Sequence, residues 1–168
     1  MSQFQLNTRS DFAADKPNLL KLLKTLKDLT EELEFGESVH FNMDLFCMIE
    51  DDLGEVCHTS GCAFGWFVIR NPGCGYKIDR RDAGQIVPDD YPIVGSHRDR
   101  TFNEWDFAQK LFRKECNGDE EFLFSPDRYI LNNQATTLEN VIHRVEHMLN
   151  GGDYGNYDYS FGKRYNRV

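Results

Sequence analysis

Hydrophobic residues recur every three or four positions between Asp15 and Glu34, which is the spacing of an amphipathic helix. Asp15 can accept hydrogen bonds from the free amides of a first helical turn, and Pro17 is tolerated in that turn because its missing N–H costs little there. The apolar positions form one stripe: Leu19, Leu22, Leu23, Leu26, Leu29 and Leu33. We interpret this stripe as core packing, with a groove for a partner helix as the less favoured alternative.

Two further helices are predicted in the second half of the chain. One begins at Asn103, as its N-cap, and ends before Gly118. The other follows Thr136, whose spacing to Glu139 is that of a capping box. The buried stripe expected on this last helix consists of Leu138, Val141, Ile142, Val145, Met148 and Leu149. The opposite face of the helix is expected to point to water.

Weaker and shorter patterns lie between these helices. Alternating positions predict a strand over 39–49, and a short buried helix is expected to begin near Cys62 and to stop at Asn71–Gly73. Residues 75–100 are rich in turn formers and are expected to hold edge strands or loop. We therefore predict an α+β fold in which a small antiparallel sheet packs with about three to four helices. A single domain, 15–150, is expected between an N-terminal arm, 1–14, and a Gly/Tyr-rich C-terminal tail, 151–168.

Composition supports one packed core. The chain has 168 residues, of which 40% are hydrophobic and 13% aromatic, and this is too apolar for a disordered protein. No internal repeat is present. Lys and Arg number 19 against 28 Asp and Glu, and the resulting net charge of -9 disfavours direct binding to nucleic acid. The acidic runs fit solvated turns and helix ends better than a dedicated face for a basic protein, although both interpretations stay open.

Sequence features also indicate the compartment. No apolar run is long enough for a membrane helix, and the N-terminal residues lack the pattern of a secretory signal. Five cysteines, an odd number, fit reduced thiols better than a disulfide framework. We expect a cytoplasmic protein without a membrane partner, and the sequence leaves its oligomeric state open.

Four potential zinc ligands fall close together in the chain: Cys57, His58, Cys62 and Cys74. Structural zinc usually takes its ligands from two tight pairs, and no second tight pair is present here. We therefore expect no cofactor and interpret the cysteines as small buried thiols, with a zinc-stabilised interaction module as an alternative.

Cys62 is also a candidate nucleophile, because a thiol at a helix N-terminus can have a lowered pKa. A thiol-dependent enzyme using Cys62, with His58 beside it in the sequence, is therefore another alternative, although no pattern places a base near the thiol. His143 and His147 match the H-x-x-E-H spacing of inverted zinc peptidases, a match that we attribute to chance. The chain contains no Walker loop, G-x-G-x-x-G fingerprint or G-x-S-x-G elbow.

The C-terminal tail combines flexible glycines with aromatic residues of the kind that anchor interfaces. One interpretation is a docking arm, and an equally favoured one is an edge strand that folds back over the core. Five residues of the tail are candidates for binding a partner: Tyr154, Tyr157, Tyr159, Phe161 and Tyr165.

The middle of the chain resembles a family of small phage and prophage proteins in which the central string reads C-G-T-x-x-C-x-x-G-W. The matching residues run from Cys57 through Thr59 and Cys62 to Gly65 and Trp66. Further matches are Phe41-Asn42-Met43 and Phe107-Ala108-x2-Leu111-Phe112, so the resemblance spans roughly residues 40–150. This sequence has His58 where glycine is usual, which puts in doubt any role that needs a glycine there.

The resemblance implies a source more than a chemistry, because no activity of the family carries over to this chain. It implies a phage-type accessory protein that binds a host protein, such as a defence complex, in the host cytoplasm and inhibits or redirects it. A binder is favoured over an enzyme on this ground.

Overall fold

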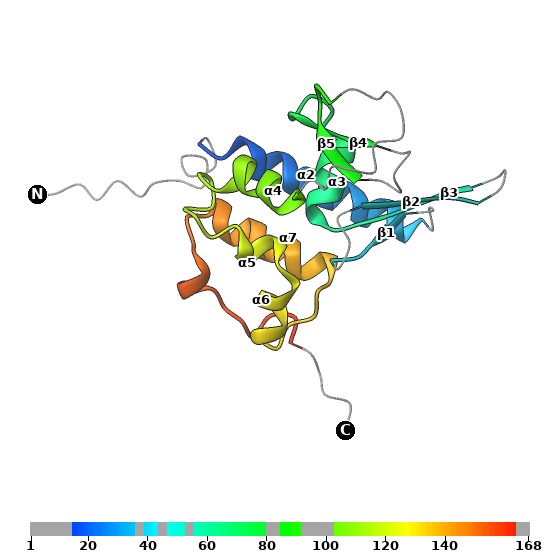
Figure 1. Ribbon diagram of the computed structural model, residues 1–168. Helices are drawn as coiled ribbons and strands as arrows, with labels where there is room; N and C mark the ends of the chain where they lie inside the picture. The colour runs from blue at the N-terminus through cyan, green and yellow to red at the C-terminus, as the bar shows by residue number, and fades with distance from the viewer. Residues whose placement is uncertain are drawn as a thin grey trace, which may run out of the picture.

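The computed structural model describes residues 15–35, 39–43, 47–52, 56–79, 85–91 and 103–163 (Figure 1). The helices within these ranges are α2 (Pro17–Glu34), α3 (Ala63–Arg70), α4 (Glu104–Phe112), α5 (Glu121–Phe124), α6 (Pro126–Leu131), α7 (Leu138–Leu149) and the 3-10 helix η2 (Tyr154–Asn156). The strands are β1 (Val39–Phe41), β2 (Cys47–Asp52), β3 (Val56–Gly61), β4 (Tyr76–Asp79) and β5 (Gln85–Pro88). The predicted α+β class is confirmed. None of the described helices is long and apolar enough to cross a membrane.

The strands form two small sheets. In the first, the order is β1-β3-β2, with β1 parallel and β2 antiparallel to β3; in the second, β4 and β5 pair antiparallel. The prediction of one strand over 39–49 is wrong, because β1 and β2 lie on opposite edges of β3 and run in opposite directions. The far ends of β2 and β3 extend away from the helices (Figure 1).

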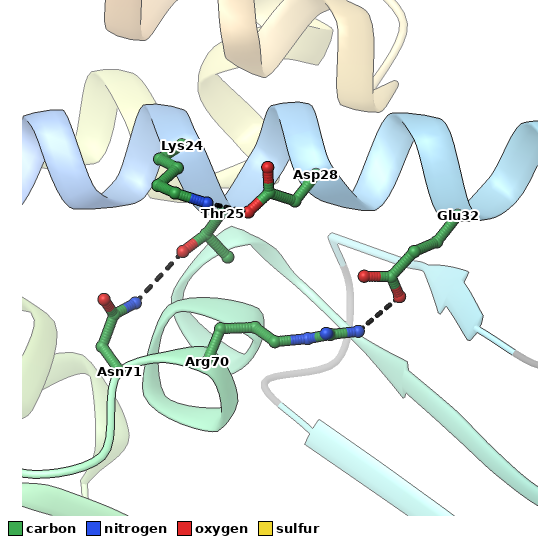
Figure 2. A network of polar contacts seen from close by, with 6 residues as sticks. All are labelled: Lys24, Thr25, Asp28, Glu32, Arg70 and Asn71. Atoms are coloured by element: carbon green, nitrogen blue, oxygen red, sulfur yellow. Dashed lines mark hydrogen bonds and ion pairs between the residues drawn. The ribbon is translucent and has the colours of Figure 1, made fainter.

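Helix α2 is the central helix of the core. Its buried side chains face α3 and α7, and they are Leu19, Leu22, Thr25, Leu26 and Leu29. Polar contacts fix α2 against the end of α3, as Figure 2 shows: Asn71 Nδ2 donates to Thr25 Oγ1 at 3.1 Å, and Arg70 pairs with Glu32. On its exposed side, Lys24 Nζ lies 2.5 Å from Asp28 Oδ2 one turn along (Figure 2).

The N-terminus of α2 is capped from elsewhere in the chain. Its N-cap residue is Lys16, which makes no side-chain cap, so the prediction that Asp15 caps this helix is wrong. Instead, Glu115 Oε1 accepts from the backbone N–H groups of Asn18 at 2.8 Å and Leu19 at 3.0 Å. The loop after α4 therefore satisfies the free amides of α2.

Helix α3 is almost wholly buried, from Ala63 to Val68. Phe64 and Phe67 both pack edge-on against Phe112 of α4, with ring centroids 6.4 and 5.0 Å apart. Phe112 in turn contacts Phe124 of α5 at 4.9 Å. One core therefore joins α2, α3, α4, α5 and α7.

Four of the six α-helices in the described residues correspond to predicted helices, and α5 and α6 do not. They have four and six residues, which is too short for a periodic pattern to be read. The extended Ser125 separates them, as expected for a residue before proline, and Pro126 opens α6.

Candidate functional site

A cavity of about 620 Å³ lies beside α5 and α6, and we call it the α6 cavity. Its apolar lining comes from three distant parts of the chain: Met43, Trp105, Phe124, Pro126 and Leu131. Cys62 and Ser125 also contribute, and Glu121, Asp127 and Arg128 supply the charged groups. Ligand-binding cavities in proteins commonly have volumes of about 300–1,000 Å³.

Two large apolar side chains stand exposed at the C-terminal end of α6. Leu131, which lines the cavity, is 78% exposed and Ile130 is 50% exposed, whereas the preceding Tyr129 is fully buried. Tyr129 fixes this arrangement, since its hydroxyl donates to the backbone oxygen of Leu123 at 2.9 Å in the core. The helix is thus anchored by one residue and presents the next two outward.

The charged groups of the α6 cavity are mostly acidic. Arg128 donates to Glu121 Oε2 from Nε at 3.2 Å and from Nη2 at 2.9 Å, and this hydrogen bonding is the main cause that raises the pKa of Arg128. Asp127 in the first turn of α6 is exposed. The pairing leaves a net negative charge among the three side chains.

Cys62 occupies the predicted position, as the N-cap of α3, but it is not activated there. The side chain is 3% exposed, and burial raises the pKa of the thiol to about 11, which outweighs the lowering effect of the backbone N–H groups of Gly65 and Phe64. At pH 7 roughly one thiol in ten thousand is then ionised. A raised pKa is the opposite of what a nucleophilic cysteine requires.

Strand β3 holds two of the four potential zinc ligands, Cys57 and Cys62, apart. Cys57 and His58 fall within β3, whose side chains are outside the described set, and Cys62 follows the end of that strand. An extended strand advances about 3.3 Å per residue, which puts the Cα atoms of Cys57 and Cys62 roughly 16 Å apart. Two thiolates on one zinc ion are separated by less than about 5 Å. No metal-binding group of three or more His, Cys, Asp or Glu occurs within the described residues.

Cys74 lies elsewhere, in the turn before β4. Its Sγ is 3.6 Å from the backbone oxygen of Tyr76, and burial is the main cause that raises the pKa of this thiol.

The histidines of the H-x-x-E-H match hold the C-terminal tail. His147 Nε2 lies 2.8 Å from both the backbone oxygen of Asp153 and Asn156 Oδ1, and because both are acceptors this nitrogen carries the hydrogen. His143 Nδ1 lies 2.7 Å from the Tyr157 hydroxyl. The prediction that this face of α7 points to water is wrong, because the tail covers it.

The described part of the tail, 151–163, folds back over α7 through turns and η2. Tyr157 is only 6% exposed and belongs to the core, so this conformation presents it to Phe122 rather than to a partner. Phe161 stacks on His143 with ring centroids 3.9 Å apart. Tyr159 is half-buried and Tyr154 is 56% exposed, while Tyr165 lies outside the described residues.

Arg144 of α7 organises the packing beneath the tail, and the hydrophobic pattern did not indicate it. It is fully buried, with its guanidinium carbon 3.6 Å from the ring centroid of Tyr129 and 4.5 Å from that of Phe122. Its nitrogens donate to Gln134 Oε1 and to the backbone oxygens of Phe122 and Arg128. Burial lowers the pKa of this group. Arg144 therefore ties α5, α6 and the tail to α7.

Comparisons of this chain with protein-family models, with curated proteins and with solved structures find no match.

Proposed function

We propose that this protein is a phage-type accessory protein that binds a host protein in the cytoplasm, such as a component of a defence complex, and inhibits or redirects it. The observation that carries the proposal is the position of Leu131, a largely exposed leucine at the edge of the α6 cavity. Leu131 and its neighbour Ile130 form contiguous exposed apolar surface beside a cavity, and such surface marks a candidate interaction site.

The exposed leucine and the adjacent cavity can both contribute binding free energy. Burial of apolar surface contributes about 25 cal/mol per Å², and a fully buried leucine contributes about 1.5–3 kcal/mol. Leu131 and Ile130 offer such surface at a cost limited to the ordering of their own side chains, because Tyr129 already anchors the helix. The cavity beside them can take an apolar side chain of the partner, against Trp105 and Phe124.

Charge indicates the type of surface that fits. The chain has a net charge of -9, and at the α6 cavity Asp127 and Glu121 outnumber Arg128. A basic surface with a protruding apolar side chain is therefore the complementary partner.

The rival enzymatic function receives no support from Cys62, whose thiol is buried and has a raised pKa. Cys62→Ala should leave the binding activity intact, whereas a thiol-dependent reaction would be abolished. A zinc-stabilised module would contain about one equivalent of metal and lose its fold with a chelator. Metal analysis below about a tenth of an equivalent removes that alternative.

Capture from host lysate with matched variants tests the proposal. Leu131→Asp places a charge at the cavity edge, and Phe35→Asp is its control, because Phe35 is 85% exposed at the end of α2. We expect a partner captured by the unmodified protein to be retained by Phe35→Asp and to be reduced at least about tenfold with Leu131→Asp. Equal retention by both variants would contradict the proposal.

A further inference from the structure

A second, smaller cavity of about 210 Å³ lies between α6 and the C-terminal tail, and we call it the Asp119 cavity. Six residues line it: Asp119, Phe122, Arg128, Asn132, Tyr154 and Tyr159. Because the lining combines residues of α6 and of the tail, the two segments lie close together, and Figure 1 shows the tail passing near α6. Two of the tyrosines that the sequence indicates as binding residues, Tyr154 and Tyr159, therefore form part of a cavity wall.

Asp119, which lines this cavity, has an unused acceptor. Its Oδ2 atom is buried, and it has no hydrogen-bond partner in the described part of the chain. Arg128, which also lines the cavity, directs its Nε and Nη2 to Glu121 and makes no hydrogen bond to Asp119 Oδ2. A buried carboxylate oxygen without a partner is costly in free energy, so a donor that enters the cavity is favoured.

The charge around Asp119 favours a cation. Burial is the main cause that raises the pKa of Asp119; Arg128 opposes the rise, while Glu120, Glu121 and Asp153 add to it. Three neighbouring carboxylates thus act against one guanidinium.

Aromatic rings form the rest of the wall. Phe122 and Tyr159 meet edge to face, with centroids 6.5 Å apart, and the Tyr159 hydroxyl donates to the backbone oxygen of Tyr154 at 2.7 Å. Aromatic faces attract cations. The same two rings lie 4.5 and 5.8 Å from the Arg144 guanidinium carbon, so a positive group already packs against them within the fold.

We propose that the Asp119 cavity binds the ammonium group of a lysine side chain from a partner protein. The ammonium pairs with the Asp119 carboxylate, and the alkyl stem lies along Phe122, Tyr154 and Tyr159. Lysine fits better than arginine, because one free oxygen in a small cavity suits a compact charge and not a bidentate fork. This site goes beyond the α6 cavity and does not depend on it.

Titration of the labelled full-length protein by NMR tests the site directly. The probe is N-acetyl-lysine methylamide at low ionic strength, where charge pairs are least screened, and N-acetyl-norleucine methylamide is the uncharged control with a similar alkyl chain. We expect saturable shifts of the Tyr154 and Tyr159 ring signals with the lysine probe alone. Equal shifts with norleucine, or no shift with lysine, overturn the proposal.

Variants locate the contact. Asp119→Asn should weaken binding of the lysine probe about tenfold, whereas Asp106→Asn, an exposed carboxylate on α4 outside both cavities, should change it less than about twofold. Tyr154→Ala should weaken it about two- to fivefold and serves as the second test if Asp119→Asn does not fold. Unchanged affinity in Asp119→Asn and Tyr154→Ala contradicts the assignment.

The same ammonium group also occurs in free diamines. Putrescine is the probe for that source, and it should bind no tighter than the lysine derivative. Binding at least about tenfold tighter overturns the assignment to a protein side chain.

Discussion

Replacing Tyr157 by alanine tests whether the tail is part of the fold. The Tyr157 ring is 6% exposed, and it packs edge-on against Phe122 with centroids 5.2 Å apart and against Tyr159 at 5.0 Å. Its hydroxyl also contacts His143 Nδ1 at 2.7 Å. Loss of a buried aromatic ring costs about 3 kcal/mol or more, and loss of the hydrogen bond adds about 1 kcal/mol. The expected decrease in the free energy of unfolding is therefore about 4 kcal/mol.

For a chain of this length, each kcal/mol shifts the melting temperature by about 2–4 °C, so Tyr157→Ala should lower it by roughly 8–16 °C. Tyr154→Ala is the control, because Tyr154 is 56% exposed and its backbone oxygen still accepts from Tyr159. Its effect should stay below about 1 kcal/mol. Differential scanning calorimetry measures both. If Tyr157→Ala melts no lower than Tyr154→Ala, the tail does not belong to the core and the reasoning fails.

Three other predictions concern single side chains. Cys62 should react with iodoacetamide at least roughly 100-fold more slowly in the native protein than in urea, because burial raises its pKa to about 11. Mass spectrometry measures both rates, and comparable rates would mean an activated thiol. Glu115→Ala should lower the free energy of unfolding by about 1–2 kcal/mol in urea titrations, because Asn18 and Leu19 lose their acceptor, and Glu115→Gln should lose less. Burial raises the pKa of Asp119, so the native state binds the Asp119 proton more readily than the unfolded state does. The free energy of unfolding therefore decreases as pH rises above about 3.9. Asp119→Asn should flatten this slope in melting curves between about pH 4 and 7. An unchanged slope would show that Asp119 is not desolvated.

The longer helices were predictable from local signals. Asn103 caps α4 as expected, since its side chain accepts from the Trp105 N–H at 3.2 Å. The start of α7 is only partly as predicted: Thr137, and not Thr136, is the N-cap, with its Oγ1 accepting from Asn140 N–H at 3.3 Å. A shift of one residue moves the cap without altering the buried stripe.

The features that depend on distant segments were not predictable. The cap of α2 comes from Glu115, 96 residues beyond Leu19 in the chain. Arg144 lies on the side of α7 that the pattern left polar, and it becomes buried because Tyr129 and the tail close over it. No periodicity along one helix encodes such contacts.

At the candidate site, too, local features were predictable from the sequence and features that depend on the folded chain were not. The position of Cys62 at a helix N-terminus followed from the sequence, whereas its high pKa follows from burial, which only the folded chain reveals. The α6 cavity was missed because α6 has six residues. The signal for it was Ser125-Pro126-Asp127, a typical helix start, followed by Ile130 and Leu131 with no later apolar residue to pair with them.

Site-specific photo-crosslinking shows directly whether the edge of the α6 cavity contacts a partner protein. A photoreactive phenylalanine analogue replaces Leu131 in one variant and Phe35 in the other, and both positions are highly exposed. Irradiation in host lysate should give a discrete crosslinked product from position 131 that is absent from position 35. No product at 131, or the same product at both positions, would contradict the account.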